Sequence, residues 1–502
     1  MPEAQTVWGI ELPILVVVYL LALMYVGYWS YKKRVGATVK DFFLSSKVLG
    51  YLVMGIGLFA TIASGNTFVG YSAKAYRAGV LFMVVPAFYV SILVGMLIVA
   101  SKLIPLSARR GYVSPGDYLL DRYGCKPLVL FLLILMFWCT FVQFFEQAIA
   151  MGYIGEVTSG GWLSYKVSAL LFMVTIAVII TLGGFRGTAL ANFIMGIVMI
   201  AAMIGFIVGI IPVLGGAGAI EKAIMEVPKK FVWPGTKGYF AWISTIILVM
   251  FGVIVYYQIL IYILATKDFK TWRRTYVYAP AIYAFIPTLF VVAGFIGLGL
   301  FPHLSKMESE KLVPMLLTYA AQKSHVAYAL GELLLLAVVS ATVSTAGAVI
   351  FALGAVLSKD IYHKAINPRA SEAKVINVSR AIMLALVVLG YIIILTPRFT
   401  LWRWVELKFE VGLQAAPALL LGLYLPWINR RGVLSGAIVG LIIALGLTFT
   451  GHAKVMGWHA GVIGFLINTV VTLLVSYATK KPDEVRKAAE IIGASQGAGV
   501  TT

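Results

Sequence analysis

The chain has 502 residues, of which 61% are hydrophobic and only 12% are charged, and its mean hydropathy is +0.95. Soluble domains carry roughly 25% charged residues, so this composition excludes a water-soluble protein and is typical of lipid-facing helices. The net charge of +20 would suggest nucleic-acid binding in a soluble chain, but here the basic residues gather in loops between apolar stretches, and we expect no nucleic-acid partner.

Apolar stretches of about 20 residues, the length that crosses a bilayer, predict an all-α polytopic membrane protein with about 13 transmembrane helices. In chain order the predicted spans are 12–30, 51–78, 80–104, 127–155, 167–184, 190–212, 240–265, 275–299, 326–357, 377–396, 405–427, 431–450 and 458–478. The first span has no small-residue cleavage site after it, so we expect a retained helix rather than a signal peptide.

Most of the 40 Lys and Arg residues fall in alternate loops. Examples are Lys32 to Arg34, Arg109 and Arg110, Lys267 to Arg274, and Lys480 and Lys481. By the positive-inside rule these loops face the cytoplasm, which places the N-terminus outside and the C-terminus inside a plasma (cell) membrane.

Three segments between and after the spans have their own patterns. In the loop 105–126, Pro115 and Gly116 precede a helix start at Asp117. Residues 312–322 favour a short external helix, and the polar tail after Thr479 is typical of a disordered segment.

The second span contains a cluster of small and polar residues, from Ala60 to Gly70. Ser, Gly and Asn are poor helix formers, and an interrupted helix would free backbone groups at mid-membrane, where transporters bind ions and substrates. Close helix packing through small residues explains the same pattern equally well.

The ninth span contains a second cluster, Ser340 to Gly347, in which Ser344 and Thr345 offer adjacent hydroxyls. Sodium is a hard cation that takes several oxygen ligands, a preference we extend to it from calcium and magnesium. The alternative is Ser and Thr packing, or hydrogen bonding of these hydroxyls to carbonyls of their own helix.

Few carboxylates lie inside the predicted spans, and Glu146 is the deepest of them. It is a candidate for a proton relay or for contact with a substrate, and a structural ion pair is the alternative. The sequence holds no Ser-His-Asp set, HExxH motif or Walker loop, so we do not expect an enzyme.

Several stretches, taken together, resemble the sodium:solute symporter family, which includes sodium–glucose and sodium–proline carriers. They occur in the family's order: Ser64 to Tyr76 with Gly79, Tyr112 to Leu119 with Arg122 to Gly124, Gly183 to Gly187, Ser358 to Tyr362, and Pro417 to Gly432. The resemblance implies a leucine-transporter-type core of two inverted five-helix repeats that works by alternating access.

On this resemblance the chain divides into five segments. They are 1–50 (an extra helix and cytoplasmic loop), 51–212 (the first repeat), 213–427 (an outer loop and the second repeat), 428–479 (two further helices) and 480–502 (a cytoplasmic tail).

The resemblance also implies the site residues. Sodium ligands would be the hydroxyls of Ser344 and Thr345 with the carbonyls of Ala60, Ala63 and Ala341. Asn192 replaces the aspartate of members with a further sodium site, which argues against a second ion. We expect the solute to contact Ser64, Gly65, Asn66, Thr67, Phe68, Phe144, Glu146, Tyr256, Tyr257, Gln258, Phe409 and Gln414.

The expected partners are therefore a small-molecule solute, a sodium ion and the lipid bilayer, while the oligomeric state is not predicted. Sugar-carrying members have polar side chains where this chain has Thr67, Pro86 and Val253 to Val255, so a monocarboxylate or an amino acid such as proline fits better. Two alternatives stay open: a proton-coupled carrier that uses a carboxylate such as Glu146, and a transporter-like receptor that senses a solute.

Overall fold

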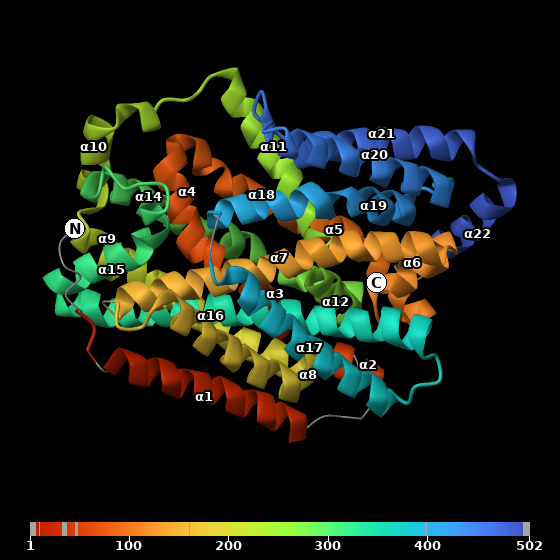
Figure 1. The fold of residues 1–502 in the computed structure, drawn as a ribbon, viewed down its shortest axis with the longest axis horizontal. Helices are drawn as coiled ribbons and strands as arrows, with labels where there is room; N and C mark the ends of the chain where they lie inside the picture. The colour runs from red at the N-terminus through yellow and green to blue at the C-terminus, as the bar shows by residue number, and fades with distance from the viewer. Residues whose placement is uncertain are drawn as a thin grey trace.

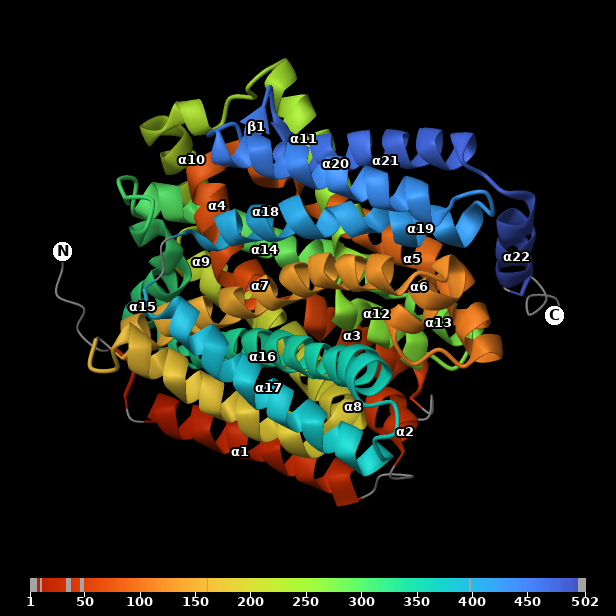
Figure 2. The same ribbon diagram turned by 45° about the vertical axis from the view of Figure 1, so that its right-hand side comes forward.

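The structure is a computed structural model that describes residues 7–494 except 10, 33–37, 46–48, 160 and 397–398. Long helices run roughly side by side through the molecule (Figures 1 and 2). In the described part of the chain, the only strands are β1 (Lys454–Val455) and β2 (Trp458–His459), which pair in a short antiparallel hairpin. The predicted all-α fold class is confirmed.

The helices follow the predicted spans, each of which overlaps one helix or several joined end to end. The first part of the chain forms α1 (Glu11–Lys32), α2 (Val39–Leu44), α3 (Tyr51–Ile62), η2 (Asn66–Gly70), α4 (Tyr71–Ala78), η3 (Gly79–Val84), α5 (Val85–Arg110), α6 (Pro115–Tyr123), α7 (Lys126–Thr158), α8 (Tyr165–Gly205), η4 (Phe206–Ile210), α9 (Ile211–Val213) and α10 (Gly216–Glu226). The rest forms η5 (Pro228–Lys230), α11 (Thr236–Val253), α12 (Tyr257–Ala265), α13 (Phe269–Thr275), α14 (Ala279–Leu300), η6 (Glu308–Lys311), α15 (Leu312–Lys323), α16 (His325–Val356), η7 (Leu357–Ile366), α17 (Glu372–Ile394), α18 (Leu401–Gly412), η8 (Leu413–Ala415), α19 (Ala416–Tyr424), α20 (Arg430–Phe449), α21 (Ala460–Ala478) and α22 (Pro482–Gly493).

Within the described residues, 9 helices are long and apolar enough to cross a membrane, and three shorter apolar helices accompany them. The polytopic character of the chain is thereby confirmed. The count of thirteen crossings stays a prediction, as do the boundaries of the five segments, because several predicted spans are broken or joined.

Helix α16 forms the centre of the bundle and is almost wholly buried, packed against α8, α7 and α3. Small residues such as Ala341, Gly347 and Gly354 lie along it, and small residues let neighbouring backbones approach closely inside a membrane. In both views α20 and α21 lie side by side at one edge of the bundle (Figures 1 and 2).

Two spans are interrupted in the middle of the bundle. The second predicted span breaks after α3, where Ala63 leaves the helical region with φ −72° and ψ 91°, and resumes at η2. The predicted span 240–265 also breaks, between α11 and α12, where Tyr256 has φ −67° and ψ 131°. The first interruption is the predicted one, whereas the second falls in an apolar stretch that the sequence analysis treats as one helix.

Helix α8 covers two predicted spans, which meet at Gly184. This residue has φ 59° and ψ −166°, a conformation that glycine adopts without a steric penalty. The stretch Gly183 to Gly187, which carries part of the family resemblance, therefore lies where the two spans join.

Two predicted features outside the spans are confirmed. Helix α15 forms where a helix is expected at 312–322, while its place outside the membrane stays a prediction; α6 begins at Pro115, two residues before the predicted start, with a capping box between Ser114 and Asp117.

The prediction that the tail after Thr479 is disordered is wrong for residues 482–493, which form α22. Pro482 opens this helix, Asp483 and Glu484 lie in its first turn, and both features favour a helix start. Ala488 and Ile491 are buried, and the helix packs against α5, so tertiary contact stabilises a segment that looks polar by composition. Residues 495–502 of the predicted tail lie outside the described residues.

Candidate functional site

The break between α3 and η2 is held open by side chains. The amide of Gly65 donates a hydrogen bond to Oε1 of Gln147 on α7, at 2.7 Å. The amide of Ser64 donates to Oγ1 of Thr67 at 3.1 Å. Amides that an intact helix would pair internally thus have other partners, because a buried backbone group without a partner is costly.

The predicted sodium residues meet where the end of α3 crosses α16. The hydroxyl of Ser344 donates to the carbonyl of Ala60 at 2.7 Å and to the carbonyl of Ala341 in its own helix at 3.2 Å. All three residues are buried. The structure therefore brings oxygens of the interrupted second span close to oxygens of the small-residue cluster in the ninth span, as expected.

The second hydroxyl makes a contact that the sequence analysis missed. Thr345 donates to the carbonyl of Thr61 at 2.9 Å, so Thr61 belongs to this cluster of oxygens. Ala63 is buried at the break, where its amide donates to the carbonyl of Phe59. The carbonyl that accepts from Thr345 is therefore that of Thr61 and not that of Ala63.

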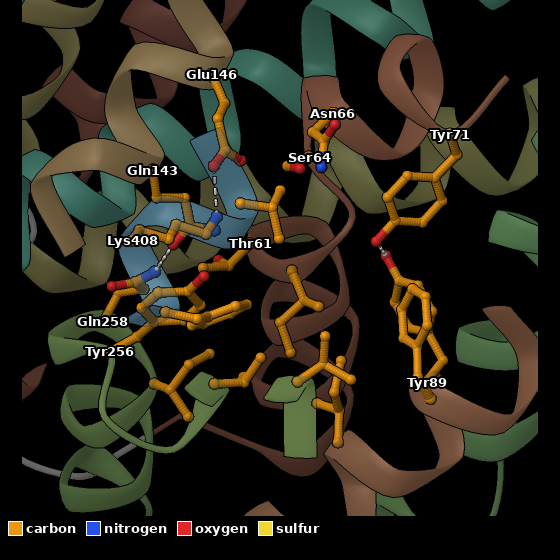
Figure 3. A pocket seen from close by; sticks show the side chains of 18 of the residues that line it. Thr61, Ser64, Asn66, Tyr71, Tyr89, Gln143, Glu146, Tyr256, Gln258 and Lys408 are labelled. Carbon is orange, nitrogen blue, oxygen red and sulfur yellow. Dashed lines mark hydrogen bonds and ion pairs between the residues drawn. The ribbon is translucent and has the colours of Figure 1, made fainter. Parts of the chain in front are cut away.

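A cavity lies beside this cluster, between the interrupted helices and α7, α5 and α18 (Figure 3). Six of the predicted solute residues line it, together with residues that were not predicted. The predicted ones are Ser64, Asn66, Glu146, Tyr256, Gln258 and Phe409. The others are Thr61, Ile62, Tyr71, Phe88, Tyr89, Ile92, Gln143, Val249, Val253, Ile259, Trp402, Val405 and Lys408.

Three other predicted solute residues lie around the break and support it. Gly65 is packed against Thr342 and Ala150 so closely that a Cβ would clash with both. Thr67 shares a hydrogen bond of 2.9 Å with the hydroxyl of Tyr89, and the ring of Phe68 packs against Phe290 of α14 in a tilted arrangement with centroids 4.6 Å apart.

The last three predicted solute residues contact other helices. Phe144 packs toward Gly390 of α17, and the hydroxyl of Tyr257 donates to the carbonyl of Leu133. The amide of Gln414 donates to the carbonyl of Gly461 on α21 at 3.1 Å. None of these three side chains lines the cavity.

Lys408 is the main residue that the sequence analysis missed. Its Nζ forms an ion pair of 2.7 Å with Oε1 of Glu146, and both side chains are buried, with 4% and 1% of their surface exposed. Figure 3 shows this pair at the cavity wall. A lysine inside the apolar stretch 405–427 was a visible signal, since charged residues within spans are rare and generally paired.

Two glutamines also connect the cavity walls. Nε2 of Gln258 on α12 donates to Oε1 of Gln143 on α7 at 2.7 Å (Figure 3). Gln143 is one turn before Glu146, so α7 presents two polar side chains to the cavity from the same face. The hydrogen-bonded glutamines and the Glu146–Lys408 ion pair together form a polar wall, opposite the aromatic rings of Tyr71 and Tyr89 (Figure 3).

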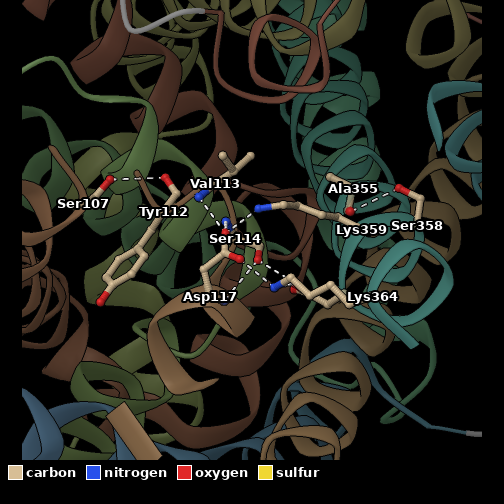
Figure 4. A network of polar contacts seen from close by, with 10 residues as sticks. Ser107, Tyr112, Val113, Ser114, Asp117, Ala355, Ser358, Lys359 and Lys364 are labelled. Carbon is tan, nitrogen blue, oxygen red and sulfur yellow. Dashed lines mark hydrogen bonds and ion pairs between the residues drawn. The ribbon is translucent and has the colours of Figure 1, made fainter. Parts of the chain in front are cut away.

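A second polar network joins α6 to η7, beyond the end of α16 (Figure 4). Asp117 pairs with Lys359 and, at 2.5 Å, with Lys364, and Lys364 also pairs with Asp360 at 2.6 Å. The hydroxyl of Ser114 donates to Asp360 at 2.7 Å. Burial alone would raise the pKa of Asp117, but the two ammonium groups outweigh it and hold that pKa well below its ordinary value.

Comparison with known proteins gives concordant results. Residues 42–440 match the sodium:solute symporter family. The chain is 29% identical over 481 residues to the sodium/pantothenate symporter of Haemophilus influenzae, with 91% of this chain and 96% of that protein covered. It is 22% identical to the osmoregulated proline transporter OpuE of Bacillus subtilis, with 94% and 96% covered.

Among solved structures, the chain is similar to the substrate-bound outward-open state of a Na+-coupled sialic acid symporter. The TM-score is 0.75 at 17% sequence identity, and the match covers 94% of this chain and 98% of that one. At this identity the likeness shows the fold alone, which is the predicted leucine-transporter type.

Proposed function

Because the chain belongs to the sodium:solute symporter family, whose members are transporters rather than enzymes, we propose that it imports a small organic acid or amino acid together with sodium. Sodium is the co-transported ion of this family. The finer points, which are the solute, the ligand residues and the direction of transport, make up the proposal.

The observation that carries the proposal is the meeting of two hydroxyls on α16 with the carbonyl end of α3. Ser344 and Thr345 already contact the carbonyls of Ala60 and Thr61 at 2.7 and 2.9 Å. A sodium ion bound among these oxygens, with the carbonyls of Ala63 and Ala341 as further ligands, would tie α3 to α16. By linkage, an ion that binds one arrangement of these helices better raises the population of that arrangement, which is the basis of alternating access.

The cavity favours a small solute with both polar and apolar parts. Its walls combine the Glu146–Lys408 pair and two glutamines with several aromatic rings. The relatives named above carry pantothenate, which is a monocarboxylate, and proline. A solute of this size and polarity is therefore the expected substrate class.

The membrane topology is also part of the proposal. The distribution of Lys and Arg supports an outer N-terminus and a cytoplasmic C-terminus in the plasma membrane. The network around Asp117 would then lie on the cytoplasmic side, and α15 on the outer side.

Uptake by proteoliposomes tests the proposal. Purified protein should accumulate at least one of pantothenate, lactate, pyruvate or proline when an inward sodium gradient is imposed, and not when only a pH gradient is imposed. Ser344→Ala and Thr345→Ala should each weaken sodium activation about tenfold or more, since each removes one hydroxyl ligand.

Ser340→Ala is the matched control for both variants. Its hydroxyl lies on the same helix but bonds to the carbonyl of Leu336 and to Tyr19, away from α3. This variant should keep wild-type sodium activation. Full activation in both Ser344→Ala and Thr345→Ala, or uptake driven by a pH gradient in sodium-free buffer, would contradict the proposal.

A further inference from the structure

The Glu146–Lys408 pair has no structural explanation in the helix packing alone. Helices α7 and α18 pack along each other, and the pair adds one ionic contact of 2.7 Å between them, beside two aromatic rings. Nζ of Lys408 lies 5.4 Å from the ring centroid of Tyr256 and 5.3 Å from that of Phe409. A buried ion pair is expensive to desolvate, and well-packed apolar residues are often as stable or more stable.

The ammonium of Lys408 has unused hydrogen-bonding capacity at the cavity. A lysine ammonium has three N–H donors, and among the described residues Glu146 is the one ionic partner of the Lys408 ammonium. Lys408 and Glu146 both line the cavity, next to Ser64 and Asn66 of the broken helix (Figure 3). Donors therefore remain for a group that enters the cavity.

We propose that Lys408 binds the carboxylate of the transported solute, and that Glu146 neutralises Lys408 while the cavity is empty. The solute class is then an organic anion with one carboxylate and no ammonium group. This inference rests on the proposed function, since it assigns the solute for the same cavity.

Charge balance gives this arrangement a direct role in coupling. In the empty protein, Lys408 and Glu146 sum to zero charge. When sodium binds beside Thr61 and a carboxylate binds at Lys408, the total is again zero, whereas either ligand alone leaves one uncompensated charge. An uncompensated charge in a water-poor interior is strongly unfavourable. Each ligand therefore favours binding of the other.

The two binding regions are close enough for this effect, because they share Thr61. Its carbonyl accepts the hydrogen bond from Thr345 at the ion cluster, and the same residue lines the cavity. Electrostatic interactions over such short distances are weakly screened when the groups are buried. A zwitterion such as proline adds no net charge, so it would leave the sodium ion unbalanced.

The test compares carboxylates with matched uncharged analogues. Sodium-driven uptake and sodium-dependent thermal stabilisation are measured for pantothenate against pantothenol, for lactate against lactamide, and for proline. Wild-type protein should respond to at least one carboxylate and discriminate against its uncharged partner. Lys408→Gln should lower affinity for the carboxylate by about 10- to 100-fold, the effect of removing a charged hydrogen bond, and should abolish the discrimination.

Glu146→Gln separates a role in coupling from a merely structural one. This variant leaves Lys408 without its internal counter-ion, so carboxylate binding should persist and should require less sodium. If Lys408→Gln does not fold, the double variant Lys408→Gln, Glu146→Gln provides the same test with a neutral pair. Lys311→Gln is the control, because Lys311 pairs with Glu156 at 2.6 Å on the same helix α7 but does not line the cavity.

Each outcome decides the question. Sodium-driven uptake of proline alone, of uncharged analogues as readily as carboxylates, or unchanged discrimination in the Lys408→Gln or double variant would overturn the inference and leave the proposed function intact. Loss of carboxylate binding in Glu146→Gln at all sodium concentrations would also overturn it. No sodium-driven uptake of any compound would overturn the proposed function itself.

Discussion

Two ionic groups in this protein pair carboxylates with lysines in different ways. In the cavity, Glu146 and Lys408 form a single pair, with 1% and 4% of their side chains exposed. Between α6 and η7, Asp117 pairs with Lys359 and Lys364, Asp360 shares Lys364, and Lys364 is 31% exposed. One is a single buried pair in an aromatic cavity, and the other is a larger, partly exposed network.

The hydrogen bonds around each group sharpen the difference. Asp117 also accepts from the backbone amides of Val113 and Ser114 at 2.8 and 2.9 Å, so its carboxylate is saturated with donors (Figure 4). The Glu146–Lys408 pair lacks such support among the described residues. A carboxylate with several donors, such as that of Asp117, is suited to holding two segments together, while a pair with few other partners is suited to exchanging partners with a ligand.

The largest expected effect is that of Lys408→Met on stability. Removing one member of a buried pair leaves an uncompensated charge and costs about 3–5 kcal/mol. The variant should therefore have a much lower melting temperature in detergent. The double variant Lys408→Met, Glu146→Gln should recover most of this loss, and a double variant as unstable as the single one would show that the pair stabilises the fold.

A smaller effect is expected for Asp117→Asn. The substitution removes ionic hydrogen bonds to two partly exposed lysines and should lower the free energy of unfolding by about 2 kcal/mol. The amide still accepts from the backbone at the α6 start, so the helix should persist. A change below a few tenths of a kcal/mol would show that the network contributes no stability.

The contribution of Asp117 to stability should also depend on pH. Because the pKa of Asp117 is lowered in the folded protein, its contribution is present above the unfolded value of about 4 and is lost as the pH falls below it. Wild-type protein should therefore lose stability relative to Asp117→Asn between about pH 4 and pH 3. If the melting temperatures of wild-type protein and Asp117→Asn fall by the same amount over this pH range, the lowered pKa of Asp117 would be contradicted.

The smallest effect is expected for Lys364→Gln. This lysine is partly exposed, Lys359 remains beside Asp117, and the hydroxyl of Ser114 still donates to Asp360, so the loss should be about 0.5–1 kcal/mol. It should shrink further in high salt, as exposed ion pairs are screened. A salt-independent loss as large as that of Lys408→Met would remove the distinction between the two ionic groups.

The sequence predicted those parts of the fold that depend on local composition. Apolar stretches located the helices, small polar residues located the break at Ser64 and Gly65, and the hydroxyls of Ser344 and Thr345 stood out within an apolar helix. These features leave a local signal because polar groups inside a membrane are unfavourable unless they have partners.

The parts that were missed depend on tertiary contact. The meeting of Lys408 with Glu146, 262 positions away, follows from how α18 packs on α7, which no local pattern encodes. Gln414 was assigned to the cavity, but the tight turn of η8 before α19 turns its side chain toward α21. Helix α22 was missed because its residues are mostly polar, and only two of them, Ala488 and Ile491, are buried against the rest of the protein.

The contact between α3 and α16 uses backbone atoms on one side and side chains on the other. Ala60 and Thr61 contribute only their carbonyls to it, whereas Ser344 and Thr345 contribute hydroxyls. Mutations that change the side chain at position 61 can therefore reshape the cavity while the carbonyl stays in place. Under the proposed function, solute specificity would change through side-chain replacement on α3, while sodium binding would depend on the hydroxyls of Ser344 and Thr345 on α16.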